Sequence, residues 1–123
     1  MITGLVTSDG QAVIHLTVRG PTGQEQDIEA IIDTGFDGWL SMPSSLISLL
    51  SLVWRQRGRA ILADGSESVF DIYEGAVLWD GQARRIPVHE AETIPLVGMS
   101  LLQGYDLTVR VEPGGNVTIR TIS

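Results

Sequence analysis

The sequence contains no cysteine, and this absence excludes several kinds of chemistry at once. Without a thiol the chain can form no disulfide, no thiolate zinc site and no cysteine nucleophile. Long apolar runs are missing too: a stretch such as Ala76–Trp79 is far shorter than the ~20 residues of a membrane-spanning helix. The segment Met1–Gly4 places no basic residues ahead of an apolar run, so we expect no secretory signal and a cytoplasmic protein without a membrane partner.

Positive charge is also scarce. The eight basic residues, all of them arginine, stand against fifteen acidic residues, which gives a net charge of −7. Proteins that bind nucleic acid usually carry a basic stripe, and a negative overall field repels phosphate. Three of the arginines, Arg55, Arg57 and Arg59, alternate along the chain, as is typical of one face of an exposed strand. The charge balance therefore argues against a nucleic-acid partner.

What the chain does have is the composition of a folded domain. Its 123 residues are 43% hydrophobic and 19% charged, which is typical neither of a disordered tail nor of a membrane bundle. No linker, low-complexity tract or tandem repeat interrupts the sequence. We therefore expect a single domain over residues 1–123, long enough to bury roughly two-thirds of its unfolded surface.

Most of the sequence alternates between apolar and polar residues with the period of a β-strand. Turn signals such as Ser8-Asp9-Gly10 and Asp80-Gly81 separate the alternating runs. The strands predicted in this way are Ile2–Thr7, Gln11–Arg19, Gln26–Asp33, Val53–Leu62, a run from Val69 to Trp79, Gln82–Glu90, Leu107–Glu112 and Asn116–Ile122. Many short strands with a turn about every ten residues indicate a mainly β protein, a small closed barrel or sandwich.

Two short helices are expected among these strands. The first follows Pro43, a residue that can occupy the first position of a helix. Its apolar side chains at helical spacing are Leu46, Leu49, Leu50 and Val53. The second, Met99–Gln103, ends at Gly104 and is long enough for one or two turns.

The most informative segment is Asp33-Thr34-Gly35, which follows directly after the apolar strand residues 30–32. A carboxylate at the end of a buried strand loses hydration unless nearby donors stabilise it. Thr34 offers a hydroxyl, and Gly35 lets the backbone turn so that its N–H faces the carboxylate. The tripeptide alone also fits an aspartate that caps a turn after a strand, which is a common feature. Its interpretation therefore depends on the rest of the chain.

That context strengthens the functional interpretation. A second apolar strand, Ile94–Val97, also runs into a glycine, Gly98, and a hairpin tip at Ala63–Ser66 lies between the two motifs. This arrangement resembles the retropepsin-like aspartic proteases over nearly the whole chain. It is most similar to their bacterial single-domain members, in which a loop of small residues, a leucine and a proline follow the Asp-Thr-Gly, as in Phe36–Pro43. The resemblance implies a small closed β-barrel with one short helix after the active-site loop and one near the C-terminus.

The resemblance also assigns roles, position by position. It implies that Asp33 is the catalytic carboxylate, that Thr34 locks the two active-site loops together across a dimer, and that Gly35 allows the substrate to approach closely. The residues implied to face the substrate are Phe36 in the loop and Ala63, Asp64 and Gly65 at the tip of a flap that closes over bound peptide. The residues implied to cross beneath the loop and support it are Leu96, Val97 and Gly98.

Two features depart from the retroviral members of the family. Those proteins carry an arginine and then an asparagine or aspartate after the second glycine, where this chain has Met99-Ser100. The flap also lacks their multiple glycines. The differences concern dimer stability and substrate choice, since that arginine helps to hold the family's dimer together. The catalytic motif itself is intact.

The implied reaction needs two carboxylates that share one proton, one as base toward a water and the other as acid toward the peptide carbonyl. This chain has one Asp-Thr-Gly and is too short for two such lobes, so a two-fold homodimer would supply the second Asp33. We therefore expect an aspartic endopeptidase for peptide or protein substrates, without a cofactor. Dimer contacts are expected from the terminal strands, through Ile2–Thr7, Val117 and Ile119. The alternative is a catalytically weak peptide-binding or dimerisation module with the same fold.

Other candidate sites carry less weight. Asp37-Gly38 and Asp64-Gly65 match no calcium-loop spacing and fit ordinary turns. His15 and His89 lie in strand patterns without a partner histidine or a close pair of carboxylates, so we expect no metal site. Ser44-Ser45 stands at a helix start and has no histidine base to activate it.

Overall fold

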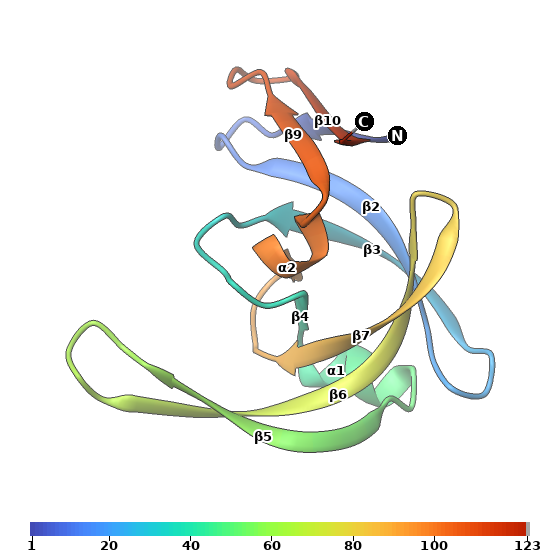
Figure 1. The fold of residues 1–123 in the computed structure, drawn as a ribbon, viewed down its shortest axis with the longest axis vertical. Coiled ribbons are helices and arrows are strands. Elements are labelled where there is room, and N and C mark those ends of the chain that lie inside the picture. Colours follow the sequence, from blue (N-terminus) through green and yellow to red (C-terminus); the bar gives the residue numbers. More distant parts are fainter. Residues whose placement is uncertain (123) are drawn as a thin grey trace.

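The structure, a computed structural model, describes residues 1–122 and consists mainly of β-strands (Figure 1). The strands are β1 (Ile2–Val6), β2 (Ala12–Arg19), β3 (Glu25–Ile32), β4 (Leu40–Met42), β5 (Val53–Ile61), β6 (Glu67–Trp79), β7 (Gln82–Glu90), β8 (Leu96–Val97), β9 (Tyr105–Val109) and β10 (Asn116–Thr121). The helices are α1 (Ser44–Leu49) and α2 (Met99–Leu102). The predicted fold class, mainly β with two short helices, is confirmed.

Six of the strands close into a barrel. The sheet runs in the order β5-β6-β7-β4-β8-β3-β2-β1-β10-β9, and one further pairing joins β6 to β2. In that pairing Thr17 lies opposite Leu78 and Arg19 lies opposite Ala76, which closes the ring β2-β3-β8-β4-β7-β6. One edge of β2 can serve two neighbours because its first half pairs with β1 and its second half pairs with β6. The closed barrel expected from the sequence is thereby confirmed.

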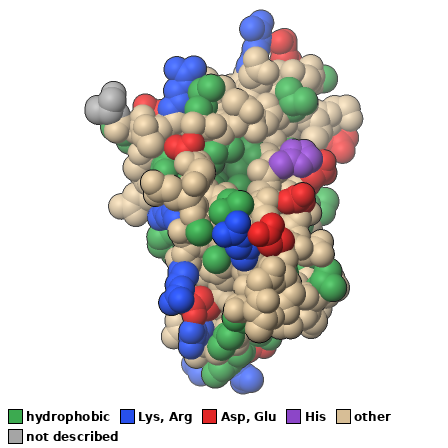
Figure 2. All heavy atoms as spheres, turned by 90° about the vertical axis from the view of Figure 1, so that its right-hand side faces the viewer, with side chains coloured by type: hydrophobic (Ala, Val, Ile, Leu, Met, Phe, Trp, Pro, Cys, Tyr) green, Lys and Arg blue, Asp and Glu red, His purple; other side chains and the backbone are tan. Residues whose placement is uncertain are grey.

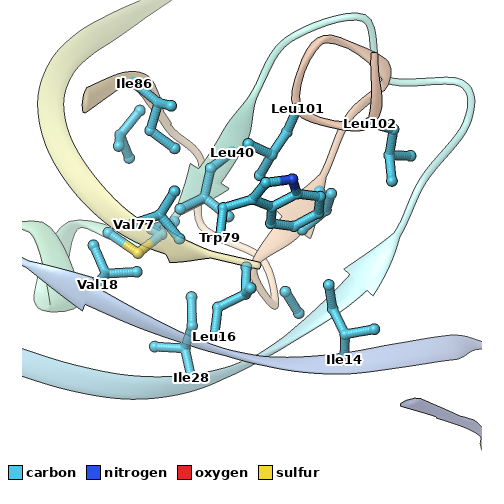
Figure 3. Close-up of a cluster of buried hydrophobic side chains, with 14 of the residues drawn as sticks. Ile14, Leu16, Val18, Ile28, Leu40, Val77, Trp79, Ile86, Leu101 and Leu102 are labelled. Carbon is cyan, nitrogen blue, oxygen red and sulfur yellow. The ribbon is translucent and has the colours of Figure 1, made fainter. Parts of the chain in front are cut away.

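The interior of the barrel is apolar. Along β2 the buried side chains are apolar and occupy every second position, as the alternating sequence predicts. Trp79 at the end of β6 is only 1% exposed and lies near Leu16, Leu40 and Leu101 (Figure 3). Because Leu101 belongs to α2, this core also fixes the helix that follows Gly98.

β5 and β6 form a long hairpin that projects beyond the barrel (Figure 1). The β6–β7 ladder runs only from Ile72, opposite His89, to Trp79, opposite Gln82. The first residues of β6, 67–71, therefore pair with β5 alone. The residues predicted to form a flap tip, 63–65, lie in the turn at the end of this free part.

The alternating arginines lie on this hairpin and face carboxylates. The pairs are Arg55 with Glu74, Arg57 with Asp71 and Arg59 with Glu67. The prediction of an exposed strand face is therefore confirmed for this segment, because all three arginines are at least half exposed. Over the face drawn in Figure 2, charged side chains of both signs are likewise interspersed rather than gathered by sign.

The first helix is shorter than its apolar spacing predicted. α1 ends at Leu49. Val53, which also continues the helical spacing, begins β5, as the strand predicted over Val53–Leu62 requires. Ser51 has a φ of 53°, a left-handed conformation that breaks the helical geometry just after its end. Leu49 is 57% exposed, so the expected apolar face is wrong at this residue. The buried side chains of this segment are Ile47, Leu50 and Leu52.

Two strand boundaries also differ from expectation. β4 was not predicted, because all three of its side chains are buried and the sequence shows no alternation there. The strand expected over Leu107–Glu112 ends at Val109, ahead of the turn at Pro113–Gly115. Within residues 1–122, neither helix has the length and apolarity needed to cross a membrane.

Candidate active site

Asp33 lies at the point where β3 leaves the barrel and enters the loop of residues 33–39, called the Asp33 loop below. Its backbone N–H donates to the carbonyl of Val97 at 2.9 Å, and its carbonyl accepts the N–H of Phe36 at 3.1 Å. Its carboxylate oxygen Oδ1 accepts the N–H of Gly35 at 2.9 Å. Asp33 is half-buried, whereas Thr34 and Gly35 are exposed. The motif is thus a tight turn that holds one carboxylate oxygen and presents the next two residues to the surface.

The segment Leu96-Val97-Gly98 runs between the two strands that flank this loop. β8 pairs in parallel with the end of β3 and antiparallel with β4, so it joins the two strands that flank the loop. Gly98 donates its N–H to the carbonyl of Trp39 at 3.0 Å. A Cβ atom on Gly98 would lie 2.2 Å from the carbonyl oxygen of Gly38, so only glycine allows the two segments to approach this closely.

The loop is fastened further at the position where the sequence departs from retroviral relatives. Met99 donates its N–H to the carbonyl of Phe36 at 2.8 Å, and Ser100 donates its N–H to the carbonyl of Gly38 at 3.1 Å. The Ser100 hydroxyl also donates to the carbonyl of Asp37 at 2.6 Å. Sequence reasoning noted Ser100 only as a departure, yet this residue holds the Asp33 loop to the start of α2.

A cleft of about 790 Å³ opens between the Asp33 loop and the two arms of the β5–β6 hairpin. Asp33, Gly35 and Phe36 line it from the loop, and residues 59–61 and 68–70 line it from the hairpin. Leu96 of β8 also lines the cleft. The structure therefore brings four of the predicted site residues together with the hairpin.

The predicted flap tip, residues 63–65, is exposed and does not belong to the lining of this cleft. It forms a tight turn in which Leu62 donates its N–H to the carbonyl of Ser66 at 2.8 Å. Gly65 has a φ of 86°, which suits glycine. The Asp64 carboxylate accepts the hydroxyl and the N–H of Ser66, and these bonds lower the pKa of Asp64. The arms of the hairpin, rather than its tip, approach the loop.

Sequence reasoning missed several lining residues of the cleft. They are Ser41 of β4, Phe70 of β6, and His89 and Glu90 of β7. Ser41 is only 3% exposed, and its hydroxyl has no hydrogen-bond partner within residues 1–122. Burial lowers the pKa of His89, against the opposing effect of the Asp37 charge. The register of β7 against β6 could not be read from the sequence, and that register brings His89 and Phe70 to the same site.

The histidines do not form a metal centre with other ligands. In the described part of the chain no cluster of three or more histidine, aspartate or glutamate side chains could hold a metal ion. His15 is largely exposed on β2, and its Nε2 lies 3.6 Å from Oε1 of Glu29 on β3. Neighbouring strands thus place a single carboxylate, that of Glu29, opposite His15.

Comparisons with known proteins agree with the fold. No family model matches the sequence, and no curated protein is similar to it at a significant level. Among solved structures, the chain is similar to a retropepsin-like aspartic protease from Rickettsia conorii. The match has a TM-score of 0.58 and 16% sequence identity, and it covers 99% of this chain and 91% of that one. The chain therefore has the fold of a retropepsin-like aspartic protease.

Proposed function

We propose that the protein is an aspartic endopeptidase, and that it hydrolyses peptide bonds with a water activated by two Asp33 carboxylates, one from each chain of a homodimer. The observation that carries the proposal is the setting of Asp33. It ends a barrel strand, its carboxylate accepts the Gly35 N–H at 2.9 Å, and it lines a cleft of about 790 Å³. The fold match to an aspartic protease supports the same reaction class.

The chemistry follows from two carboxylates at short distance. Two such groups cannot both be ionised at modest cost, so they share one proton. The ionised carboxylate takes a proton from water, and the neutral one donates its proton to the peptide carbonyl oxygen as the tetrahedral intermediate forms. In this chain the Gly35 N–H occupies Oδ1 of Asp33, which leaves Oδ2 for the water or the partner carboxylate.

One chain supplies half of this arrangement. The sequence has a single Asp-Thr-Gly, so the second carboxylate has to come from a second copy related by a two-fold axis. Thr34 and Gly35 are exposed beside Asp33, as an interface between the two loops requires. The same axis would place two β5–β6 hairpins over one shared cleft.

The strand pairing narrows the choice of dimer contacts. β1 and β10 pair with each other; the other edge of β10 is paired with β9, and that of β1 is paired with β2 over residues 4–6. The sheet therefore ends at β5 and β9. The Arg110 N–H donates to the carbonyl of Asn116, and the Ile122 N–H donates to the carbonyl of Gly104, so these residues form hydrogen-bonded pairs of the β9–β10 ladder. Because hydrogen-bonded pairs alternate along an antiparallel ladder, the N–H groups of residues 105, 107 and 109 point away from β10. We infer that β9, rather than β1 or β10, offers backbone groups to the second copy.

The substrate of such a cleft is an extended peptide. The hairpin arms present strand backbone on one side, and the Asp33 loop closes the other. An extended peptide binds such a surface by main-chain hydrogen bonds. A peptide-binding or dimerisation module with little turnover would use the same cleft, and the two functions differ in whether Asp33 carries chemistry.

A paired assay separates these functions. Wild-type protein and Asp33→Asn are each incubated with a peptide library at several pH values, and cleavage is read by mass spectrometry. The amide of Asp33→Asn cannot accept a proton from water, so we expect cleavage by the variant to fall by at least ~100-fold while peptide binding and folding are retained. Equal cleavage by both proteins would remove Asp33 from the mechanism. Binding without cleavage by the wild type would establish the module instead.

A further inference from the structure

Three rings stack across the cleft from three different elements. His89 of β7 lies between Phe36 of the Asp33 loop and Phe70 of β6. The ring centroids of Phe36 and His89 are 5.3 Å apart at an interplanar angle of 71°, an edge-to-face contact. Those of Phe70 and His89 are 4.8 Å apart at 31°. Both spacings fall in the range in which aromatic pairs attract each other.

The stack stands at the point where the hairpin leaves the barrel. The β6–β7 ladder begins with Ile72 opposite His89, and residues 67–71 of β6 have no partner on β7. Phe70 lies in this unpaired part, two residues before the ladder starts. The contact between Phe70 and His89 therefore joins the hairpin to β7 just beyond the last backbone pairing of the two strands. A hairpin that swings over the cleft would bend here.

Glycines make room for the two phenylalanine rings. A Cβ atom on Gly38 would lie 2.5 Å from the ring of Phe36, and one on Gly98 would lie 2.7 Å from it. On the hairpin, a Cβ atom on Gly58 would lie 2.4 Å from the ring of Phe70. The Cβ atom on Gly38 would also lie 3.0 Å from the His89 ring. The missing side chains at Gly38, Gly98 and Gly58 thus leave the space in which Phe36 and Phe70 pack, and His89 lies between these two rings.

We propose that His89 is a positioning residue: its ring ties the β5–β6 hairpin to the Asp33 loop at the hinge of the flap, and so sets the position of the hairpin over the cleft. The inference rests on the proposed function for its consequence in catalysis, though not for the contact itself. His89 does not act on the substrate; it acts through Phe70 and Phe36. The lowered pKa of His89 agrees with this role, because a neutral ring packs between two phenyl rings without the cost of burying a charge.

The first arm of the test measures the position of the hairpin directly and does not depend on enzymatic activity. Since the chain has no native cysteine, spin labels can be attached at Asp64→Cys on the tip and Ser48→Cys on α1, both exposed positions. Labelled chains are diluted with unlabelled ones, so that each dimer carries one labelled chain. We expect a narrow distance distribution in the wild type, a broader one in His89→Ala and a narrow one again in His89→Phe, whose ring restores the stack. His15→Ala, on the exposed face of β2, is the matched control and should leave the distribution unchanged.

The second arm measures peptide cleavage by the same proteins. Loss of two ring contacts should raise KM by about tenfold in His89→Ala with a smaller change in kcat, and His89→Phe should restore KM. A purely structural role would instead lower the folded fraction, and with it the maximal rate at constant KM. If His89→Ala does not fold, Phe70→Ala removes the same contact from the hairpin side.

The outcomes separate the two proposals. Identical distance distributions in the wild type and in His89→Ala or Phe70→Ala overturn the hinge role, whatever the activity. A broadened distribution in the absence of any cleavage by the wild type keeps the hinge role and rejects the protease. A broadened distribution with an unchanged KM rejects the link between hairpin position and substrate binding.

Discussion

At the scale of single residues, two hydrogen bonds shape the Asp33 loop: the Gly35 N–H donates to the Asp33 carboxylate, and the Ser100 hydroxyl donates to the Asp37 carbonyl. The order strand, Asp, Thr, Gly predicts a turn that holds a carboxylate, and the Gly35 N–H contact has this geometry. The role of Ser100 could not be predicted, because its hydroxyl bonds the Asp37 carbonyl from 63 positions away. His89 was likewise recognisable only as a histidine in a strand. Contacts between residues that are distant in sequence depend on register, which local patterns do not encode.

One prediction at this scale concerns pH. Burial lowers the pKa of His89 below its ordinary value of 6.5, so between these two values the unfolded chain binds more protons than the folded one. This group therefore contributes stability fully above pH 6.5, and the contribution is lost as the pH falls toward the folded pKa. We expect the wild type to lose stability relative to His89→Phe between pH 7.5 and about pH 5. Denaturant unfolding of both proteins across this range measures the difference. A difference that is constant with pH, or one that favours the wild type at low pH, would contradict the assigned direction.

At the scale of elements, alternation located the long strands well and the short ones poorly. β2 and β7 have one buried face, so their period is visible in the sequence, whereas β6 was predicted from a long apolar run between two turn signals. β4 is buried throughout, and its three residues contain too little pattern to predict a strand. The helical spacing of apolar residues after Pro43 continues to Val53 by chance, whereas α1 ends at Leu49, shortly before the left-handed φ of Ser51. Tertiary pairing decides such boundaries.

A second prediction belongs to β9 as the edge strand of the sheet. Leu107→Pro removes the outward N–H that we infer is available to a second copy, and proline is tolerated where that N–H faces away from the ladder. Leu107→Ala is the matched control, since it also removes the half-buried side chain but keeps the N–H. Each dimer loses the bond twice by symmetry, so Leu107→Pro should weaken dimerisation by about tenfold or more relative to Leu107→Ala. Sedimentation equilibrium measures the dimer dissociation constant of each variant. Equal dissociation constants would exclude β9 from the interface.

At the scale of the whole molecule, the mainly β closed barrel was predictable because many short strands with one buried face have few ways to close. The way in which the barrel closes was not predictable, since it depends on a short pairing of residues 17–19 of β2 with residues 76–78 of β6. The projecting hairpin could not be predicted either, because it arises where β6 is longer than its ladder with β7. The cleft arises between these two features, where the Asp33 loop faces the free part of the hairpin.

The central claim is that two chains share one catalytic dyad, and a mixing experiment tests it most directly. Wild-type protein is combined with a threefold excess of Asp33→Asn, subunits are exchanged to equilibrium, and the peptide-cleaving activity is compared with that of the same total protein as wild type. If each site needs two Asp33 carboxylates, activity follows the square of the wild-type fraction and falls to about one-sixteenth. Activity of about one-quarter, the value expected when each wild-type chain acts alone, would contradict the shared dyad.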